Sequence, residues 1–188
     1  MSSIRLFILA SLEERGAMHG HAMRLLAEQE HVDEWADVTV GAIYGALKRL
    51  AADGLIHAVR VEREGNYPER QVFEVTEAGL ASLRVIRREA LETLVYRPDP
   101  VDLALARLGR EDLADLPGIL EARVAELRDR IAREETKPDR IGHHLTLTEL
   151  HVMRHDLHRL QGELAWHDEL LAALPAIIAD ETSRKNAS

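Results

Sequence analysis

The stretch VTVGAIYGALKRLAADGLI, from Val38 to Ile56, has the pattern of one short amphipathic helix. Its apolar residues recur at i, i+4 and i+7, as they do on the inward face of a helix: Ile43, Leu47 and Leu50. Thr39 stands where its side-chain oxygen can cap the first turn, and Gly54 can take the left-handed conformation that ends a helix. The stretch therefore predicts a helix from Thr39 to Gly54 with one side in a core.

The outward side of this helix carries no acid. Between Thr39 and Ala52 the only charged residues are Lys48 and Arg49, although the formal net charge of the chain is -9. Tyr44 lies four residues before Lys48, on the same side of the helix. Gly41 and Gly45 allow a close approach of the backbone to a partner. A small, acid-free face with a phenol and an ammonium group suits phosphate oxygens, so we predict that this helix enters the major groove of DNA.

Length and composition limit the remaining possibilities. A chain of 188 residues with 46% hydrophobic content can form one large domain or two small ones. It has no cysteine, which excludes a disulfide framework and a thiolate nucleophile. No apolar run approaches the ~20 residues that cross a bilayer, and the amino terminus lacks the pattern of a secretory signal, so we expect a cytoplasmic protein without a membrane partner. Because the chain is acidic, nucleic-acid binding must depend on a local basic patch.

The segments around this helix predict the rest of a domain. IRLFILASLEERG and MHGHAMRLLAEQEH have helical patterns before it. After Gly54 the period changes to two in LIHAVRVERE and RQVFEVT, which predicts a hairpin turning at GNYPE. Thr76 should cap a further helix that ends before the prolines of YRPDP. This order of elements is that of a winged helix-turn-helix, and we place this DNA-binding domain at residues 1–95.

The hairpin should act as the wing. Arg60, Arg63 and Arg70 flank its polar turn, as expected of an arm that lies along a DNA backbone or minor groove, although three glutamates dilute the charge. The predicted DNA-binding residues of both segments are Thr39, Tyr44, Lys48, Arg49, Arg63, Asn66 and Arg70. Structural roles stay open for some of them. Tyr44 could pack against the preceding helix, Lys48 and Arg49 could be solvated, and Arg70 could pair with Glu62 across the hairpin.

The second half, residues 96–188, has the periodicity of a coiled coil. Apolar positions alternate by three and four residues through Leu150, Met153, Leu157, Leu160, Leu164, His167, Leu171 and Leu174. A shorter run comprises Leu120, Val124, Leu127 and Ile131, with Pro117 forcing a kink or a restart upstream and TKPDRIG supplying the connection. We predict an antiparallel helical hairpin that forms a coiled-coil-like dimerisation domain. The expected fold is therefore mainly α, with an α+β amino-terminal part.

Histidines are concentrated in this half, and His151, His155 and His158 share one helical face. Such a set could hold a transition metal, and a metal-dependent or hydrolytic enzyme is the alternative that it raises. No HExxH motif is present, and the face points away from the seam, so we interpret it as a solvated stripe. His167 lies in the seam itself, where burial requires a hydrogen-bond partner; a pH-sensitive joint is the alternative. We predict no catalytic residue, no metal and no cofactor.

The amino-terminal half resembles the PadR family of transcriptional regulators. The matching segments are MHGHAM, TVGAIYGALKRLAADGLI and PERQVFEVTEAGLASL, and ELAW at residues 163–166 is similar to the subfamily with a long carboxyl-terminal helical domain. Three positions depart from the usual family pattern. His21 stands where an aromatic residue is usual, Val40 where proline is common, and Phe73 where tyrosine is common.

The resemblance implies a homodimeric repressor that binds a palindromic or pseudo-palindromic operator. It also implies release by a small hydrophobic or phenolic effector, bound between the two domains or at the dimer interface. The aromatic residues available to stack on such a compound are Trp35, Tyr96 and Trp166. The alternative function is a protein-interaction module with weak or no DNA binding, which the acidic wing and the acidic net charge suggest.

Overall fold

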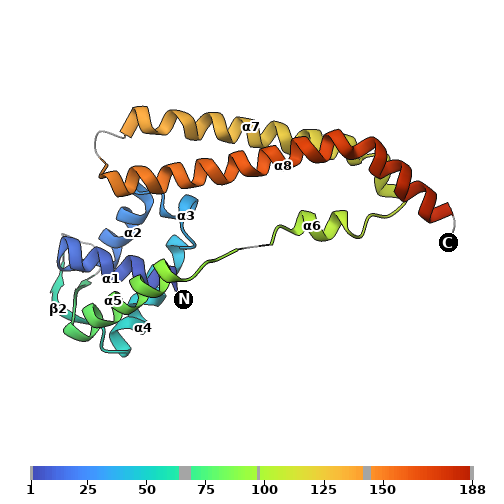
Figure 1. Ribbon diagram of the computed structural model, residues 1–188. Coiled ribbons are helices and arrows are strands. Elements are labelled where there is room, and N and C mark those ends of the chain that lie inside the picture. Colours follow the sequence, from blue (N-terminus) through green and yellow to red (C-terminus); the bar gives the residue numbers. More distant parts are fainter. Residues whose placement is uncertain (1, 64–68, 97, 142–144, 187–188) are drawn as a thin grey trace. The chain divides into compact units, whose positions relative to one another are not determined.

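The computed structural model describes residues 2–63, 69–96, 98–141 and 145–186. The chain divides into two compact units, Met1–Tyr96 and Arg97–Ser188. The first contains short helices and a three-stranded antiparallel sheet, and the second is helical throughout its described elements (Figure 1). This architecture confirms the predicted fold class of a winged helix-turn-helix followed by long helices.

The first unit follows the predicted order of helices. These are α1 (Ser3–Arg15), α2 (Gly20–Gln29), α3 (Val32–Trp35), the 3-10 turn η1 (Val40–Ala42), α4 (Ile43–Ala52) and α5 (Glu77–Glu92). Gly16 ends α1 with a φ of 76°, and Gly54 follows α4 with a φ of 70°. Past α4, the Leu55 amide donates to the Leu50 carbonyl and the Gly54 amide to the Ala51 carbonyl. This is the Schellman arrangement that a left-handed glycine permits, as predicted for Gly54.

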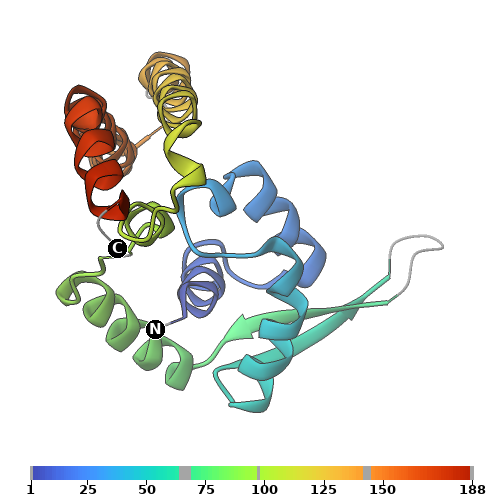
Figure 2. The ribbon, with the colours of Figure 1, turned by 90° about the vertical axis from the view of Figure 1, so that its right-hand side faces the viewer.

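The sheet contains the predicted hairpin and one further strand. β2 (Ile56–Glu62) and β3 (Arg70–Val75) pair antiparallel, and β1 (Met18–His19) adds to the other side of β3. The hairpin projects from the helices of its unit (Figure 2). We had assigned Met18 and His19 to a helix, which was wrong. Two residues are too few to show a strand period, and the residues opposite them in the strand register, Phe73 and Val72, come from far along the chain.

The helices of the first unit enclose one hydrophobic core. Its fully buried members include Ile8, Leu9, Leu12, Met23, Ile43, Leu50, Ile56 and Leu83. The predicted inward residues of α4 are all buried here. This packing leaves the opposite side of α4 at the surface.

The two predicted threonine caps differ. Thr76 precedes α5 and its hydroxyl accepts a hydrogen bond from the Gly79 amide at 3.0 Å. Thr39 has an extended backbone before η1, but its side chain makes no capping hydrogen bond, so that part of the prediction was wrong. The first turn is a 3-10 turn, closed by the Ala42 amide bonding to the Thr39 carbonyl at 2.9 Å. The tighter turn satisfies this amide through the backbone without the threonine hydroxyl.

The second unit is a helical hairpin with a short preceding helix. Its elements are α6 (Pro100–Leu105), the 3-10 turn η2 (Glu111–Leu113), α7 (Leu116–Ile141) and α8 (Leu147–Asn186). α7 and α8 lie side by side along most of their length (Figure 1). Leu116, Leu120 and Leu174 form a buried cluster between them, and every predicted seam residue of α8 is at least partly buried.

The connection between these helices falls later than predicted. α7 begins around Pro117, where a missing backbone N–H needs no helical partner, and then continues through most of TKPDRIG to Ile141. A proline removes a single backbone hydrogen bond, so helical neighbours on both sides can carry the helix past it. Thr146 and Glu149 cap the start of α8 reciprocally: the Thr146 amide donates to the Glu149 carboxylate at 2.7 Å, and the Glu149 amide to the Thr146 hydroxyl at 3.3 Å.

Candidate nucleic-acid interface

The outward side of α4 displays small and basic residues. Gly41, Tyr44, Gly45, Lys48 and Arg49 are exposed, whereas the apolar residues between them are buried. Within the described parts of the chain, neither Lys48 nor Arg49 has an ion-pair partner. No other atom would lie within 4 Å of a Cβ at Gly41. Packing inside the chain therefore does not explain the small side chain at that position.

Tyr44 both packs within the domain and reaches the surface. A Cβ placed on Gly20, the first residue of α2, would lie 2.9 Å from Tyr44 Cε1 and 3.0 Å from Leu47 Cδ1. The ring therefore packs against the start of α2, which is the structural role that the sequence left open for Tyr44. Tyr44 nevertheless reaches the surface, because 51% of its area is exposed to solvent. Its position allows the phenol to be held firmly while it faces outward.

The start of α2 adds a group of side chains that our sequence analysis missed. His19 caps the helix, because its Nδ1 accepts a hydrogen bond from the Ala22 amide at 2.8 Å. The His19 and His21 rings stack with their centroids 6.1 Å apart. Partial burial, followed by the nearby positive charges of Arg70 and Arg24, lowers the pKa of His21 below its ordinary value. The repeated histidine around Gly20 was the available sequence signal.

The charged residues of the wing are partly paired. Arg60 Nε donates to Glu62 Oε1 at 2.7 Å, and both side chains are exposed. Glu62 stands opposite Arg70 in the strand register. Arg70, the first residue of β3, therefore also lies beside the glutamate that pairs with Arg60. Arg63 is exposed at the end of β2. The predicted contact Asn66 lies outside the described residues.

The structure places the described residues of the predicted set on two segments of one unit, η1–α4 and the hairpin. Thr39, Tyr44, Lys48 and Arg49 lie on η1 and α4 or directly before them, and Arg63 and Arg70 lie on the hairpin. Thr39 is exposed at the start of this segment. Arg49 extends over Gly45, with its Nη1 3.4 Å from the position of a Cβ there. A glycine at 45 thus leaves room for a guanidinium group on the outward side.

The three predicted effector residues are not gathered in one pocket of the first unit. Trp35 is 55% exposed and lines a groove of about 330 Å³ between α1, α3 and the end of α5, where its neighbours include Leu6, Phe7 and Val32. Its indole N–H donates to the Glu30 carbonyl at 3.0 Å, which fixes the ring at the groove edge. Tyr96 does not line this groove, and Trp166 belongs to the second unit.

His167 is a buried histidine whose two ring nitrogens both have partners. Its Nε2 accepts a hydrogen bond from Arg123 Nε at 3.0 Å, so the ring proton lies on Nδ1, which is 2.8 Å from the Glu163 carbonyl. Arg123 also donates to Asp99 Oδ2 at 3.1 Å, and Asp99 caps α6 through the Val101 amide. This contact set links α6, α7 and α8, and it is the satisfied core histidine that the seam position predicted.

The described residues contain no group of three or more histidine, aspartate or glutamate side chains placed to hold a metal ion. His151, His155 and His158 are exposed on α8, in agreement with a solvated stripe. Among the described helices, none is long and apolar enough to cross a membrane.

The helices α1, α2 and α4 followed by a β-hairpin define a winged helix-turn-helix of the kind found in transcriptional regulators, and the outer side of α4 is small and basic. Residues 8–85 match the model of the Transcriptional regulator PadR-like family. The match covers most of the first unit, which confirms the resemblance noted in the amino-terminal half of the sequence. The family is one of regulators and not of enzymes, so the prediction of a non-enzymatic protein is also confirmed.

Solved structures share the fold over nearly the whole chain. PadR of Bacillus subtilis in complex with operator DNA superposes with a TM-score of 0.68 at 18% identity, covering 93% of this chain and 98% of that one. The same protein in complex with p-coumaric acid has a TM-score of 0.68 at 16% identity, covering 93% and 99%. A PadR-like transcriptional regulator from Bacillus cereus has a TM-score of 0.59 at 18% identity, covering 90% and 94%. No curated protein sequence matches the chain significantly.

Proposed function

We propose that this PadR-family regulator binds operator DNA through α4 and the wing. The observation that carries the proposal is the outward side of α4, which is small, free of acid and basic in a chain of net charge -9. A helix in the major groove must present such a face, because an acid there would meet phosphates or the electronegative base edges. The similar fold of Bacillus subtilis PadR, which binds operator DNA, supports the assignment.

The proposed DNA contacts fall into two groups, contacts to backbone phosphates and contacts to bases. Tyr44, Lys48 and Arg70 contact phosphates, and they position the protein on the duplex. Arg63 and Asn66 extend these contacts along the wing. Base reading falls to Thr39 and Arg49, since the glycines of the helix face offer no side chain for direct contact. Specificity therefore depends strongly on the shape of the DNA.

We place the dimer in the second unit. One winged domain with few basic residues binds DNA weakly at physiological salt, whereas a two-fold pair doubles the contacts and fixes the half-site spacing of a palindromic operator. The residues of the α7–α8 seam are at least partly buried within the second unit. Other apolar side chains of this unit are exposed at its surface, namely Ile119, Leu147, Val152 and Trp166. An isologous contact between two copies would bury such residues. In this arrangement the protein acts as a homodimeric repressor.

A small aromatic compound is the proposed effector, and the groove beside Trp35 is its site in the first unit. The groove has apolar side chains from α1 and α3, an indole at its edge, and a volume of about 330 Å³ that suits one small ring compound. Bacillus subtilis PadR binds p-coumaric acid, which supports this class of ligand. We expect a lipophilic aromatic compound to quench tryptophan fluorescence and to weaken operator binding together. Quenching with unchanged operator affinity would contradict the regulatory role.

Lys48→Ala tests the DNA-binding proposal. Loss of a phosphate contact should weaken binding to operator and unrelated duplexes alike, and should reduce the slope of log affinity against log salt by about one per half-site. Fluorescence anisotropy over a salt series measures both. Arg88→Ala is the control, because Arg88 is an exposed cation of α5 in the same unit and its loss changes the net charge equally.

If the folded Lys48→Ala protein keeps both its affinity and its salt slope, α4 does not face DNA. The interaction-module function would then be favoured, with the partly neutralised wing as the observation behind it.

A further inference from the structure

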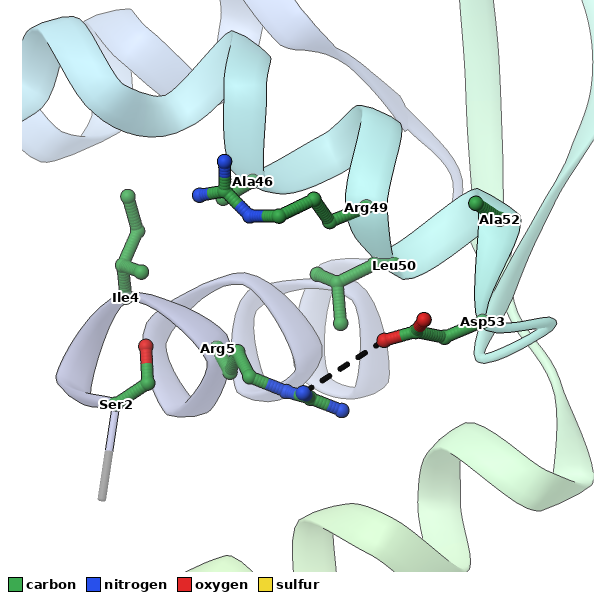
Figure 3. A pocket seen from close by; sticks show the side chains of 8 residues that line it. All are labelled: Ser2, Ile4, Arg5, Ala46, Arg49, Leu50, Ala52 and Asp53. Carbon is green, nitrogen blue, oxygen red and sulfur yellow. Dashed lines mark ion pairs between the residues drawn. The ribbon is translucent and has the colours of Figure 1, made fainter.

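The beginning of α1 and the end of α4 border an open surface cavity that the contacts above do not explain. It has a volume of about 180 Å³ and lies within the first unit. Leu50 and Ala46 supply apolar wall, and Ser2, Arg5, Arg49 and Asp53 supply the polar groups. Figure 3 shows Arg49 extending along α4 beside Ala46, while Arg5 runs along α1 toward Asp53.

The cavity contains more positive than negative charge. Two guanidinium groups, from Arg5 and Arg49, line it together with a single carboxylate, that of Asp53. The Arg5 Nη1 to Asp53 Oδ2 distance is 3.6 Å, which is longer than a hydrogen bond. Arg49 has no ion pair within the described chain. One carboxylate at this distance leaves the two cations incompletely neutralised.

One donor of a residue that lines the cavity also lacks an acceptor in the described part of the chain. Arg5 Nε is buried and has no hydrogen-bond partner among the described residues. A buried donor of a charged group is unfavourable when it is unpaired, so an acceptor that reached this atom would be bound favourably. Ser2 precedes α1, yet its hydroxyl makes no capping hydrogen bond, and the first turn of α1 contains no acid. Each of these features favours an incoming anion.

The position of the cavity on α4 suggests the source of that anion. Residues of a helix are spaced by about 100°, so Tyr44 and Arg49 lie on opposite flanks of the outward side. The Tyr44 flank borders α2 at Gly20, and the Arg49 flank borders α1 at the cavity. A helix in the major groove has a phosphate backbone on each side of it. The two flanks would therefore meet different strands.

We propose that this cavity is a phosphate-binding pocket that takes one backbone phosphate of the DNA strand opposite to the one that Tyr44 contacts. Arg5 binds the phosphate oxygens, the Ser2 hydroxyl donates a further hydrogen bond, and Arg49, which we assign to base reading, adds its positive charge at the edge of the pocket. Asp53 opposes the phosphate and holds Arg5 in place before DNA arrives. The inference rests on the proposed DNA-binding function and adds α1 to the interface.

Two substitutions in the full chain give opposite results if the pocket binds phosphate. Arg5→Met removes a cation while it keeps the length of the side chain, so duplex affinity should fall several-fold and the salt slope should decrease by about one per half-site. Asp53→Asn removes the opposing carboxylate, so duplex affinity should rise. An ion pair with a structural role alone predicts lower thermal stability in both variants and no gain in affinity from Asp53→Asn.

Arg87 and Glu13 provide the matched controls. They form an ion pair at 2.8 Å in the same unit with similar exposure, away from α4. Arg87→Met and Glu13→Gln therefore report the effect of net charge. If Arg5→Met changes duplex affinity and salt slope no more than Arg87→Met does, and Asp53→Asn no more than Glu13→Gln does, the pocket is not a phosphate site. Should Arg5→Met fail to fold, the Asp53→Asn comparison with Glu13→Gln decides alone.

Lys48→Ala separates this inference from the function on which it rests. A loss of affinity in Lys48→Ala with none in Arg5→Met refutes the pocket and keeps the DNA-binding function, whereas no loss in either refutes both. Inorganic phosphate, compared with chloride at equal ionic strength, distinguishes the source of the anion. Competition by phosphate that disappears in Arg5→Met supports the pocket. Phosphate binding with unchanged duplex affinity in Arg5→Met would assign it to a free anion and overturn the DNA contact.

Discussion

Gly20 controls how closely α2 and α4 approach. A side chain at this position would meet the Tyr44 ring at 2.9 Å and the Leu47 side chain at 3.0 Å. Both distances are shorter than ordinary van der Waals contact, so a larger residue would push Tyr44 away from α2. A glycine at the start of α2 therefore helps to set the direction of the phenol that we assign to a phosphate.

His21 should make operator binding depend on pH. Its pKa is lowered in the free protein, first by partial burial and then by Arg70 and Arg24, whereas a nearby phosphate would favour the protonated ring and raise the pKa in the complex. The complex then binds more protons than the separate partners. Affinity should therefore increase as pH falls through the pKa of the complex, and become constant below the pKa of the free protein. Anisotropy titrations between about pH 5.5 and 8 measure this.

His21→Gln should remove most of the pH dependence, and His155→Gln, an exposed histidine of α8, should leave it unchanged. An unchanged pH profile in His21→Gln would show that the start of α2 does not approach a phosphate.

At the scale of the elements, Thr76 joins α5 to the turn after α4. Its hydroxyl accepts from the Gly79 amide at 3.0 Å and lies 2.9 Å from the Gly54 carbonyl and 3.1 Å from the Leu55 carbonyl. We expect Thr76→Ala to lower the free energy of unfolding by about 1–2 kcal/mol, measured by urea denaturation. Thr39→Ala should change it by less than about 0.5 kcal/mol, because the Thr39 hydroxyl makes no cap. Equal losses in the two variants would contradict the structural difference between them.

At the scale of the whole molecule, the two units should have separate roles. The core of the first unit is composed of residues from α1 to α5, so a chain ending at Tyr96 should fold. Without the second unit it should be monomeric in sedimentation and should bind operator much more weakly than the full chain, since paired half-sites are lost. Equal footprints of the truncated and intact proteins would place the dimer contact in the first unit.

Much of the architecture can be predicted from short stretches of sequence. The helical spacing of Ile43, Leu47 and Leu50 predicted the buried side of α4, and the change of period after Gly54 predicted the hairpin. The left-handed turn at Gly54 and the cap at Thr76 were also predictable. Each of these features depends on residues close together in the chain, so a local pattern is enough to specify it.

Other features arise only when distant segments meet. β1 becomes a strand because β3 pairs with it, and α7 continues past the proline at which we expected a connection. His167 finds its partner in Arg123, 44 residues earlier, on a different helix. The sequence analysis predicted Arg49 as a DNA contact and did not single out Arg5, and the two share a cavity because α1 packs beside α4.

The sequence by itself determined the main helices, the β2–β3 hairpin and the acid-free side of α4, because these are properties of neighbouring residues. Only the tertiary structure decided which side chains meet, because hydrogen bonds, close approaches such as that of Tyr44 to Gly20, and shared cavities depend on packing between residues far apart in the chain.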